Sequence, residues 1–288
     1  MFMLDGESRG FAKKTVEFYT QRLFPFLRYC DGAGAATVAD LSAPLIRAYL
    51  ATLQKRQKAG TLSSATVHSY ARAIRTFSLF LVREELLDVS PFSKVKMPRL
   101  ESKVLPALTA EEVQTVLKAC ECERDKAIVM LMLDAGVRAG ELCALDAGDV
   151  DNSGAVTVRM GKGAKRRETY IGARTRKQLL RYFALERGGH PAPGEPLFVS
   201  QKGGKRLTYW GLAQVVRRLR KRTGVATLAP HALRRTMAIH SLRNGMNVYT
   251  LARMLGHSDI QVLKQYLDIV QADVKTAARA AGVVDNLL

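Results

Sequence analysis

Apolar side chains recur at helical spacing in three segments of the first 90 residues, and polar stretches separate these segments. The segments span 11–30, 42–53 and 66–84, and the second begins with Ser42 and Pro44, which are residues typical of a helix start. The pattern predicts four or five short helices and an all-helical first part of the chain.

The next stretch, 91–109, loses this periodicity. It contains three prolines and several lysine and arginine residues, which is a composition typical of a linker. We therefore predict a first domain over 1–96, a linker over 97–108 and a second domain over 109–288.

The second domain has a mixed pattern. Thr109 and Glu112 form a capping-box motif at the start of a helix. Segments 155–160 and 166–172 alternate like strands around a glycine-rich turn and predict a β-hairpin. Further helices are predicted at 124–134, 173–187, 208–222, 231–244, 247–255 and 259–267, with a last amphipathic stretch at 270–282. The expected fold class is mostly α with a small antiparallel sheet (α+β).

The net charge narrows the class of partner. The 288 residues contain 45 lysines and arginines against 26 aspartates and glutamates, a formal net charge of +19. The excess is present in both predicted domains, which favours two surfaces that face one long polyanion such as nucleic acid. A membrane surface, or simply a basic proteome, is the alternative explanation. No apolar run is long enough to cross a membrane, and no secretory signal is visible.

The four cysteines do not suggest a disulfide framework. Cys30, Cys120, Cys122 and Cys143 are interpreted as ordinary helix cysteines in a reducing compartment. One residue separates Cys120 from Cys122, and no second pair or nearby histidine accompanies them, so we predict no metal site. The expected location is the cytoplasm.

Candidate chemistry begins at a predicted helix junction and a hairpin tip. Arg138 lies at the junction, after Gly136, where it can point into a cleft, although pairing with Glu141 on the surface is the alternative. Lys162 lies between two glycines at the hairpin tip, so the turn can approach a ligand closely, although a solvated basic turn fits equally well. The turn lacks the GK[ST] ending of a phosphate-binding loop, and nucleotide binding there is excluded.

The segment HALRRTMAIH, residues 231–240, contains four basic or titratable side chains and no carboxylate. A spacing of three places His231 and Arg234 on one helical face, near a helix start where free N–H groups favour an anion. Arg235 is rotated about 100° from Arg234 and is expected to contact DNA backbone or protein instead. His240 is interpreted as structural.

Two candidates lie further along the chain. His257 follows a glycine that ends a helix, where a capping or packing role is the common one. Tyr266 lies among apolar residues in QVLKQYLDI, where a tyrosine usually packs at the edge of a core.

Taken together, AGVRAGELCAL, GKGAK, HALRR, LGH and QY occur in the order and approximate spacing of the tyrosine recombinases, which include phage integrases, Xer proteins and Cre-like enzymes. The resemblance covers nearly the whole chain. It implies that the helical front part is a core-binding domain and that the second domain is catalytic. One departure is Arg235, because many relatives have a second histidine there in an H-x-L-R-H pattern.

The resemblance implies a site-specific DNA recombinase. Tyr266 would attack a DNA phosphodiester, form a 3′-phosphotyrosyl link and free a 5′-hydroxyl. The other implied catalytic residues are Arg138, Lys162, His231, Arg234 and His257, with Glu141 in support.

The chemistry explains why these residue types are needed. Guanidinium groups stabilise the negative charge that grows on the phosphate oxygens. The phenol, with a pKa of about 10, needs His231 or a water molecule near Glu141 to take its proton. Lys162 is expected to protonate the leaving 5′-oxygen. With this fixed positive charge no obligatory metal is expected. The covalent link conserves the bond energy, so neither ATP nor another cofactor is expected.

The implied partner is double-stranded DNA with paired inverted binding sites. A homo-tetramer on this DNA is expected, or a hetero-tetramer with a related recombinase, in the cytoplasm and associated with the nucleoid. The apolar stripe at 270–282 is expected to dock onto a neighbouring protomer, and docking on its own domain is the alternative. Expected DNA contacts are Arg72, Arg75, Arg217, Arg218 and Lys221.

Two other functions remain open at this point. A type IB topoisomerase uses a similar site to relax supercoils, but the modest length of the chain counts against it. A catalytically silent DNA-binding regulator would show a degraded catalytic position, and all six positions are intact here.

Overall fold

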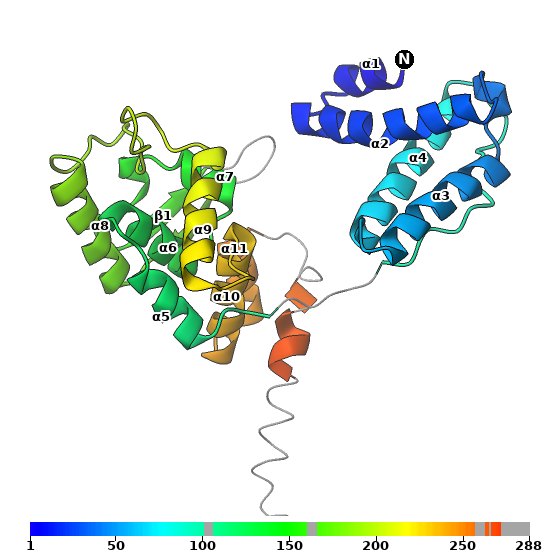
Figure 1. Ribbon diagram of the computed structural model, residues 1–288. Helices are drawn as coiled ribbons and strands as arrows, with labels where there is room; N and C mark the ends of the chain where they lie inside the picture. Colours follow the sequence, from blue (N-terminus) through cyan, green and yellow to red (C-terminus); the bar gives the residue numbers. More distant parts are fainter. Residues whose placement is uncertain (101–105, 160–165, 257–262, 265, 272–288) are drawn as a thin grey trace, which may run out of the picture. The chain divides into compact units, whose positions relative to one another are not determined.

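The computed structural model describes residues 1–100, 106–159, 166–256, 263–264 and 266–271 (Figure 1). The chain divides into two compact units, Met1–Lys103 and Val104–Leu288. The point of division lies within the segment 97–108. Each unit is described by itself below.

The first unit consists of helices, and residues 1–100 contain no strand. Its elements are α1 (Phe2–Ser8), α2 (Lys13–Gly32), a 3₁₀ turn (Val38–Asp40), α3 (Ala43–Lys58) and α4 (Ser64–Arg83). Helices α2 and α3 both pack against α4. Helix α3 begins directly after Ser42 and has Pro44 in its first turn, as the sequence predicts. The prediction of a helical first part is therefore confirmed.

Helix α1 is the element of this unit that the periodicity did not predict. Its seven residues are too short to show a helical repeat. Phe2 holds it in place, because its ring meets the rings of Tyr19, Phe77 and Phe80 edge-on at 5.1–5.6 Å between centroids. These aromatic contacts stabilise α1 through tertiary packing rather than helix propensity.

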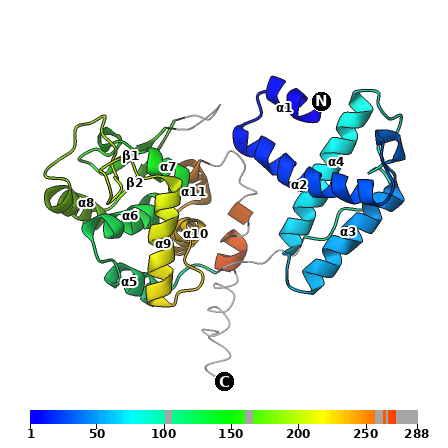
Figure 2. The same ribbon diagram turned by 45° about the horizontal axis from the view of Figure 1, so that its top comes forward.

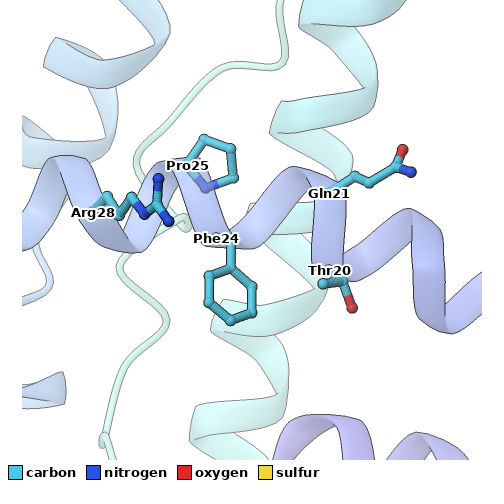
Figure 3. Close-up of a pocket in the computed structure, with 5 residues that line it drawn as sticks. All are labelled: Thr20, Gln21, Phe24, Pro25 and Arg28. Atoms are coloured by element: carbon cyan, nitrogen blue, oxygen red, sulfur yellow. The ribbon is translucent and has the colours of Figure 1, made fainter.

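The outer face of α2 is hollowed around Pro25, which lies inside the helix (Figure 3). A proline cannot donate the hydrogen bond to the carbonyl four residues earlier. Thr20, Gln21, Phe24 and Arg28 line this shallow hollow, and the Phe24 ring is exposed.

The second unit adds helices to one small sheet. Its elements are α5 (Ala110–Lys118), α6 (Glu123–Ala135), α7 (Ala139–Ala144), a 3₁₀ turn (Ala147–Asp149), β1 (Ala155–Val158), β2 (Arg167–Tyr170), α8 (Ala173–Glu186), α9 (Tyr209–Thr223), α10 (Pro230–Arg243) and α11 (Val248–Leu255). The capping box of Thr109 and Glu112 is present at the start of α5. The predicted fold class, mostly α with a small antiparallel sheet, is confirmed.

Strands β1 and β2 form the predicted antiparallel hairpin, with Val158 opposite Arg167. Both strands are shorter than the predicted segments 155–160 and 166–172. Arg167 and Thr169 of β2 face the interior, and Glu168 and Tyr170 face solvent. The tip of the hairpin, with Lys162, lies outside the described residues.

Helix α6 lies at the centre of the second unit, against α8 and α10, and α11 packs against α10 and β2 (Figure 2). The core of this unit is built around buried side chains of α6, including Ile128, Leu131 and Met132. This packing brings β2, the joint between α6 and α7, and the ends of α10 and α11 close together. In the part of the chain that the structure describes, no helix has the length and apolar character needed to span a membrane.

The structure corrects one expectation from the sequence, and another lies mostly outside the described residues. Cys120 and Cys122 lie in the connection between α5 and α6 rather than in a helix, because α5 ends at Lys118. Residues 266–271 are helical. The rest of the predicted amphipathic stretch 270–282 lies outside the described residues.

Candidate active site

The joint between α6 and α7 positions Arg138. Helix α6 ends at Gly136, which adopts the left-handed conformation with φ +60°. A Cβ atom at Gly136 would lie 2.8 Å from Leu255 Cδ2 and 3.0 Å from Met237 Sδ, so glycine is needed for both conformation and space. Arg138 then caps α7, and its backbone N–H donates to Glu141 Oε2 at 2.7 Å.

Glu141 joins two arginines. Arg138 Nη1 donates to Oε1 at 2.9 Å, and Arg167 donates to both carboxylate oxygens at 2.9 and 2.6 Å. Burial raises the pKa of Glu141, but the hydrogen bonds from Arg167 and Arg138 outweigh it and lower the pKa to about 2. Glu141 is therefore an ionised positioning group at neutral pH. The pairing of Arg138 with Glu141, which was one of the two interpretations of Arg138 from the sequence, is present in the structure.

Arg167 is the residue of this cluster that the sequence reasoning missed. Its side chain is 7% exposed, and its Nε also donates to the Met254 carbonyl at 2.8 Å. A signal was present: the alternation of RRETYIG places Arg167 on the same strand face as Thr169 and Ile171, and a charge on a buried face needs a partner.

The side chain of Arg234, on α10, extends to the ends of α6 and α11. Its guanidinium is buried and donates to the Gly136 carbonyl, and to the Leu255 carbonyl at 2.6 Å. These are the terminal carbonyls of α6 and α11, which have no partner within their own helices. The side chain therefore ties the ends of two helices to α10.

The electrostatic surroundings of Arg234 identify its neighbours. Burial, and then the positive charges of Arg138 and Arg167, lower the pKa of Arg234 to about 10, whereas Glu141 and Tyr266 raise it. The group stays protonated at neutral pH. Within the described part of the chain, Arg138 and Arg167 thus pair with Glu141, and Arg234 lies close enough for their charges to act on it. Three guanidinium groups around one carboxylate leave an excess of positive charge that attracts an anion.

Tyr266 lies beside this cluster. It is partly buried and packs against the apolar cluster of α10 and α11 that contains Met237, Leu251 and Leu255. Burial lowers the pKa of Arg235, and the nearby Tyr266 phenol partly offsets this effect. Tyr266 therefore lies close to Arg234 and Arg235 of α10, about 30 residues away in the sequence.

The remaining predicted catalytic residues are placed only in part. His231 is exposed in the first turn of α10, three residues before Arg234. Lys162 and His257 lie outside the described residues.

The other polar residues of α10 hold the start of the second unit. Arg235 Nε donates to the Pro106 carbonyl at 3.0 Å, and the Leu108 N–H donates to Thr236 Oγ1 at 2.9 Å. His240 Nε2 lies 3.1 Å from the Leu108 carbonyl oxygen. The sequence predicted that Arg235 would contact DNA backbone or protein and that His240 would be structural. In the structure both side chains contact protein.

The residues expected to contact DNA differ in their surroundings. Arg72 and Arg75 are exposed on α4, and the Arg72 guanidinium lies over the Phe18 ring at 5.1 Å from its centroid. On α9, Arg217 and Lys221 are exposed, whereas Arg218 pairs with the buried carboxylate of Asp125 at 2.8 Å.

Comparison with known proteins finds two family models along the chain. The model of the phage integrase family matches residues 106–272, which is more than half of the chain. The phage integrase N-terminal SAM-like domain matches residues 6–85.

Individual relatives cover nearly the whole chain. Tyrosine recombinase XerC of Myxococcus xanthus is 30% identical over 91% of this chain and 89% of its own length. Tyrosine recombinase XerD of Oceanobacillus iheyensis is 29% identical over 93% and 91%. The solved Tn1549 transposon integrase in complex with a circular intermediate DNA shares the fold, with a TM-score of 0.76 at 19% identity over 96% of this chain and 98% of that chain. The chain therefore belongs to the phage integrase family of tyrosine recombinases.

Proposed function

We propose that this recombinase cuts and rejoins DNA strands at specific sites through a covalent 3′-phosphotyrosyl bond to Tyr266. The observation that carries the proposal is the convergence of Arg138, Arg234 and Tyr266 from three separate segments. Arg138 pairs with Glu141, which Arg167 joins to the end of α11, where Arg234 bonds the Leu255 carbonyl and Tyr266 packs against the cluster that contains Leu255. A nucleophilic phenol beside fixed guanidinium groups suits attack on a phosphodiester, whose reacting phosphorus gains charge on its oxygens.

Arg138 and Arg234 act as the phosphate clamp. Each guanidinium donates in a fixed plane and stays charged at neutral pH. Glu141 holds Arg138 at 2.9 Å, and the two helix-end carbonyls hold Arg234. Preorganised donors need little rearrangement when charge develops, so the clamp favours the transition state over the ground state.

The protons move at both ends of the reacting phosphate. The Tyr266 phenol gives its proton to His231 or to a water molecule as its oxygen bonds to phosphorus. The bond to the 5′-oxygen breaks, and Lys162 supplies the proton that this oxygen needs. His257 donates a hydrogen bond to the phosphate or orders the segment of Tyr266. Glu141 has a pKa of about 2 and is therefore already ionised, so its role is to position Arg138.

Rejoining reverses these steps with another strand. A 5′-hydroxyl attacks the phosphotyrosyl phosphorus, and the phenol leaves and takes back a proton. The number of phosphoester bonds is unchanged, so the cycle needs no ATP. The fixed guanidinium groups stabilise the charge on the phosphate, so we propose no obligatory metal.

The partner that we propose is double-stranded DNA with paired inverted sites, bound by a homo-tetramer or by a hetero-tetramer with a related recombinase. A solved lambda integrase tetramer bound to a Holliday junction has this fold, with a TM-score of 0.73 at 19% identity over 90% of this chain and 73% of that chain. Residues 1–96 form the core-binding domain, 97–108 the linker and 109–288 the catalytic domain.

Tyr266→Phe tests the chemistry. The variant lacks the nucleophilic oxygen, so we expect it to form no covalent adduct on a nicked suicide duplex that traps the wild-type adduct. The adduct is measured as a protein–DNA band that survives denaturing electrophoresis. Tyr249→Phe, a change at an exposed tyrosine of α11, is the matched control and is expected to keep wild-type adduct levels.

Other outcomes separate the competing functions. An adduct without strand exchange, together with relaxation of any supercoiled plasmid, would favour a type IB topoisomerase. No adduct on a DNA site that the wild-type protein binds would favour a silent regulator. The bound site is found first by mapping the protein across the host genome.

Substitutions on α9 test the DNA surface. Arg217→Ala and Lys221→Ala each remove an exposed cation, so we expect each to reduce the slope of log affinity against log salt by about 1. Arg218→Ala, on the same helix, breaks the ion pair with Asp125 and is expected to lower the melting temperature with a smaller change of slope. Slopes are measured by fluorescence anisotropy on labelled duplex DNA. Equal slopes for wild type and Arg217→Ala would show that Arg217 does not contact the DNA phosphates.

A further inference from the structure

The first residue of β2 contributes a side chain that none of the steps above uses. Arg167 is 7% exposed and donates hydrogen bonds inward, to the two carboxylate oxygens of Glu141 and to the Met254 carbonyl. Glu141 belongs to α7 and Met254 to α11, so this one guanidinium joins three elements.

The Arg167 side chain packs closely against the backbone at Gly256. A Cβ atom at Gly256 would lie 2.9 Å from Arg167 Cδ and 3.1 Å from its Nε, and Gly256 also adopts φ +68°. The glycine that ends α11 thus leaves room for the arginine. The guanidinium lies at the end of α11, where free carbonyls favour a cation.

Arg167 contacts the partners of both clamp residues. Glu141 Oε1 accepts from Arg138 as well as from Arg167, at 2.9 Å in each case. Met254 and Leu255 are adjacent, and their carbonyls accept from Arg167 and Arg234 respectively. A change at Arg167 therefore reaches Arg138 through one carboxylate and Arg234 through one helix end.

We propose that Arg167 is a positioning residue of the recombination reaction, which fixes Arg138 through Glu141 and Arg234 through the end of α11. The inference rests on the proposed function, because it assigns the clamp to Arg138 and Arg234. Arg167 itself touches neither DNA nor the nucleophile. A lysine cannot replace it, since one ammonium cannot grip both carboxylate oxygens in a plane and reach Met254 as well.

The first experiment compares cleavage rates in the full-length protein. Arg167→Gln and Arg167→Lys are mixed in excess with the suicide duplex, and the single-turnover rate of adduct formation is measured beside the affinity for intact duplex. We expect both variants to bind DNA like wild type and to cleave it about 10²-fold more slowly, as expected for a small displacement of catalytic groups. Wild-type cleavage by a folded Arg167→Lys would overturn the proposal.

Arg159→Gln is the matched control. Arg159 lies at the end of β1, on the other side of the hairpin, and pairs with Asp146 and Asp149 at 2.9 and 2.7 Å. The substitution removes the same charge from the same hairpin without touching Glu141. We expect cleavage within a few-fold of wild type. A loss equal to that of Arg167→Gln would show a general effect of hairpin charge and would overturn the proposal.

A double-mutant cycle separates positioning from mere stability. If Arg167 acts largely through Glu141, then Arg167→Gln combined with Glu141→Gln loses much less cleavage than the product of the two single losses. Independent, multiplicative losses would overturn the proposal, as would failure of both Arg167 variants to fold, because Arg167 would then serve stability alone. A wild-type protein without any adduct would overturn the proposed function and this inference together. Adduct formation unaffected by Arg167 would overturn the inference alone.

Discussion

Arg234→Lys is expected to slow covalent attachment to DNA by about 10²- to 10³-fold, the loss typical of one preorganised donor to a developing oxyanion. Lysine keeps the charge but loses the planar fork. In the structure the fork is aimed by two carbonyls, those of Gly136 and Leu255, and a single ammonium cannot satisfy both in the same geometry. Arg234→Ala removes the charge as well and is expected to abolish cleavage.

The neighbouring arginine supplies the controls. Arg235→Lys makes the same exchange one residue later, where the side chain donates to the Pro106 carbonyl. Arg235→His introduces the residue that many relatives have at this position. We expect both to cleave within a few-fold of wild type, measured as single-turnover adduct formation. Loss of cleavage in Arg235→His with normal cleavage in Arg234→Lys would show that the assignment of faces on α10 is wrong.

Stability must be followed in the same variants, because the Gly136 and Leu255 carbonyls lose a donor when Arg234 is replaced. An unsatisfied buried polar group costs about 1–3 kcal/mol. Thermal melting followed by circular dichroism checks that the cleavage assay is made on folded protein. A folded Arg234→Lys that binds duplex DNA like wild type and does not cleave it locates the loss in the chemical step.

Helix α10 shows what local pattern can predict. Pro230 predicted the start of the helix, and a spacing of three placed His231 and Arg234 on one face. The sequence could not show what Arg234 contacts. The Gly136 and Leu255 carbonyls come from helix ends that meet α10 only in the folded chain. Periodicity reports a face, whereas a contact depends on tertiary packing.

Arg167 shows the opposite case, because local composition concealed its role. It is the last of three successive basic residues in GKGAKRR, a run that suggests a solvated turn. Only the strand alternation after the turn distinguishes it from Arg166, which is exposed. The pairing with Glu141 spans 26 residues and two elements. No local rule links a hairpin to the joint between α6 and α7.

From the sequence, Glu141 was expected to position Arg138 or a basic neighbour rather than to titrate, with a water molecule near it as one possible proton acceptor. Spacing alone could not identify the basic neighbour, because Arg167 comes from β2. With Arg167 in place the carboxylate is 12% exposed and doubly paired. This arrangement makes the stability of the catalytic unit depend on pH.

Glu141 is expected to contribute stability that is lost in acid. Its pKa is about 2 in the folded chain against an ordinary value of 4.5, because Arg167 and Arg138 outweigh the effect of burial. The stabilisation is therefore complete above pH 4.5 and disappears as the pH falls from 4.5 through 2. The difference in pKa corresponds to about 3 kcal/mol of unfolding free energy. Urea unfolding at pH 7, 5, 4 and 3 measures it.

Glu141→Gln isolates this contribution. At pH 7 the amide leaves Arg138 and Arg167 without their counter-charge, and breaking a buried pair in this way costs about 3–5 kcal/mol. Other paired carboxylates titrate equally in both proteins, so the difference between wild type and variant should shrink as the pH falls below 4.5. Glu168→Gln, at an exposed neighbour of Arg167, is the control and should follow wild type at every pH. A difference that stays constant down to pH 3 would mean that Glu141 stabilises the fold by packing. The ion pairs of Glu141 with the two arginines would then contribute little to stability. A group other than Glu141 would have to hold Arg138 in position.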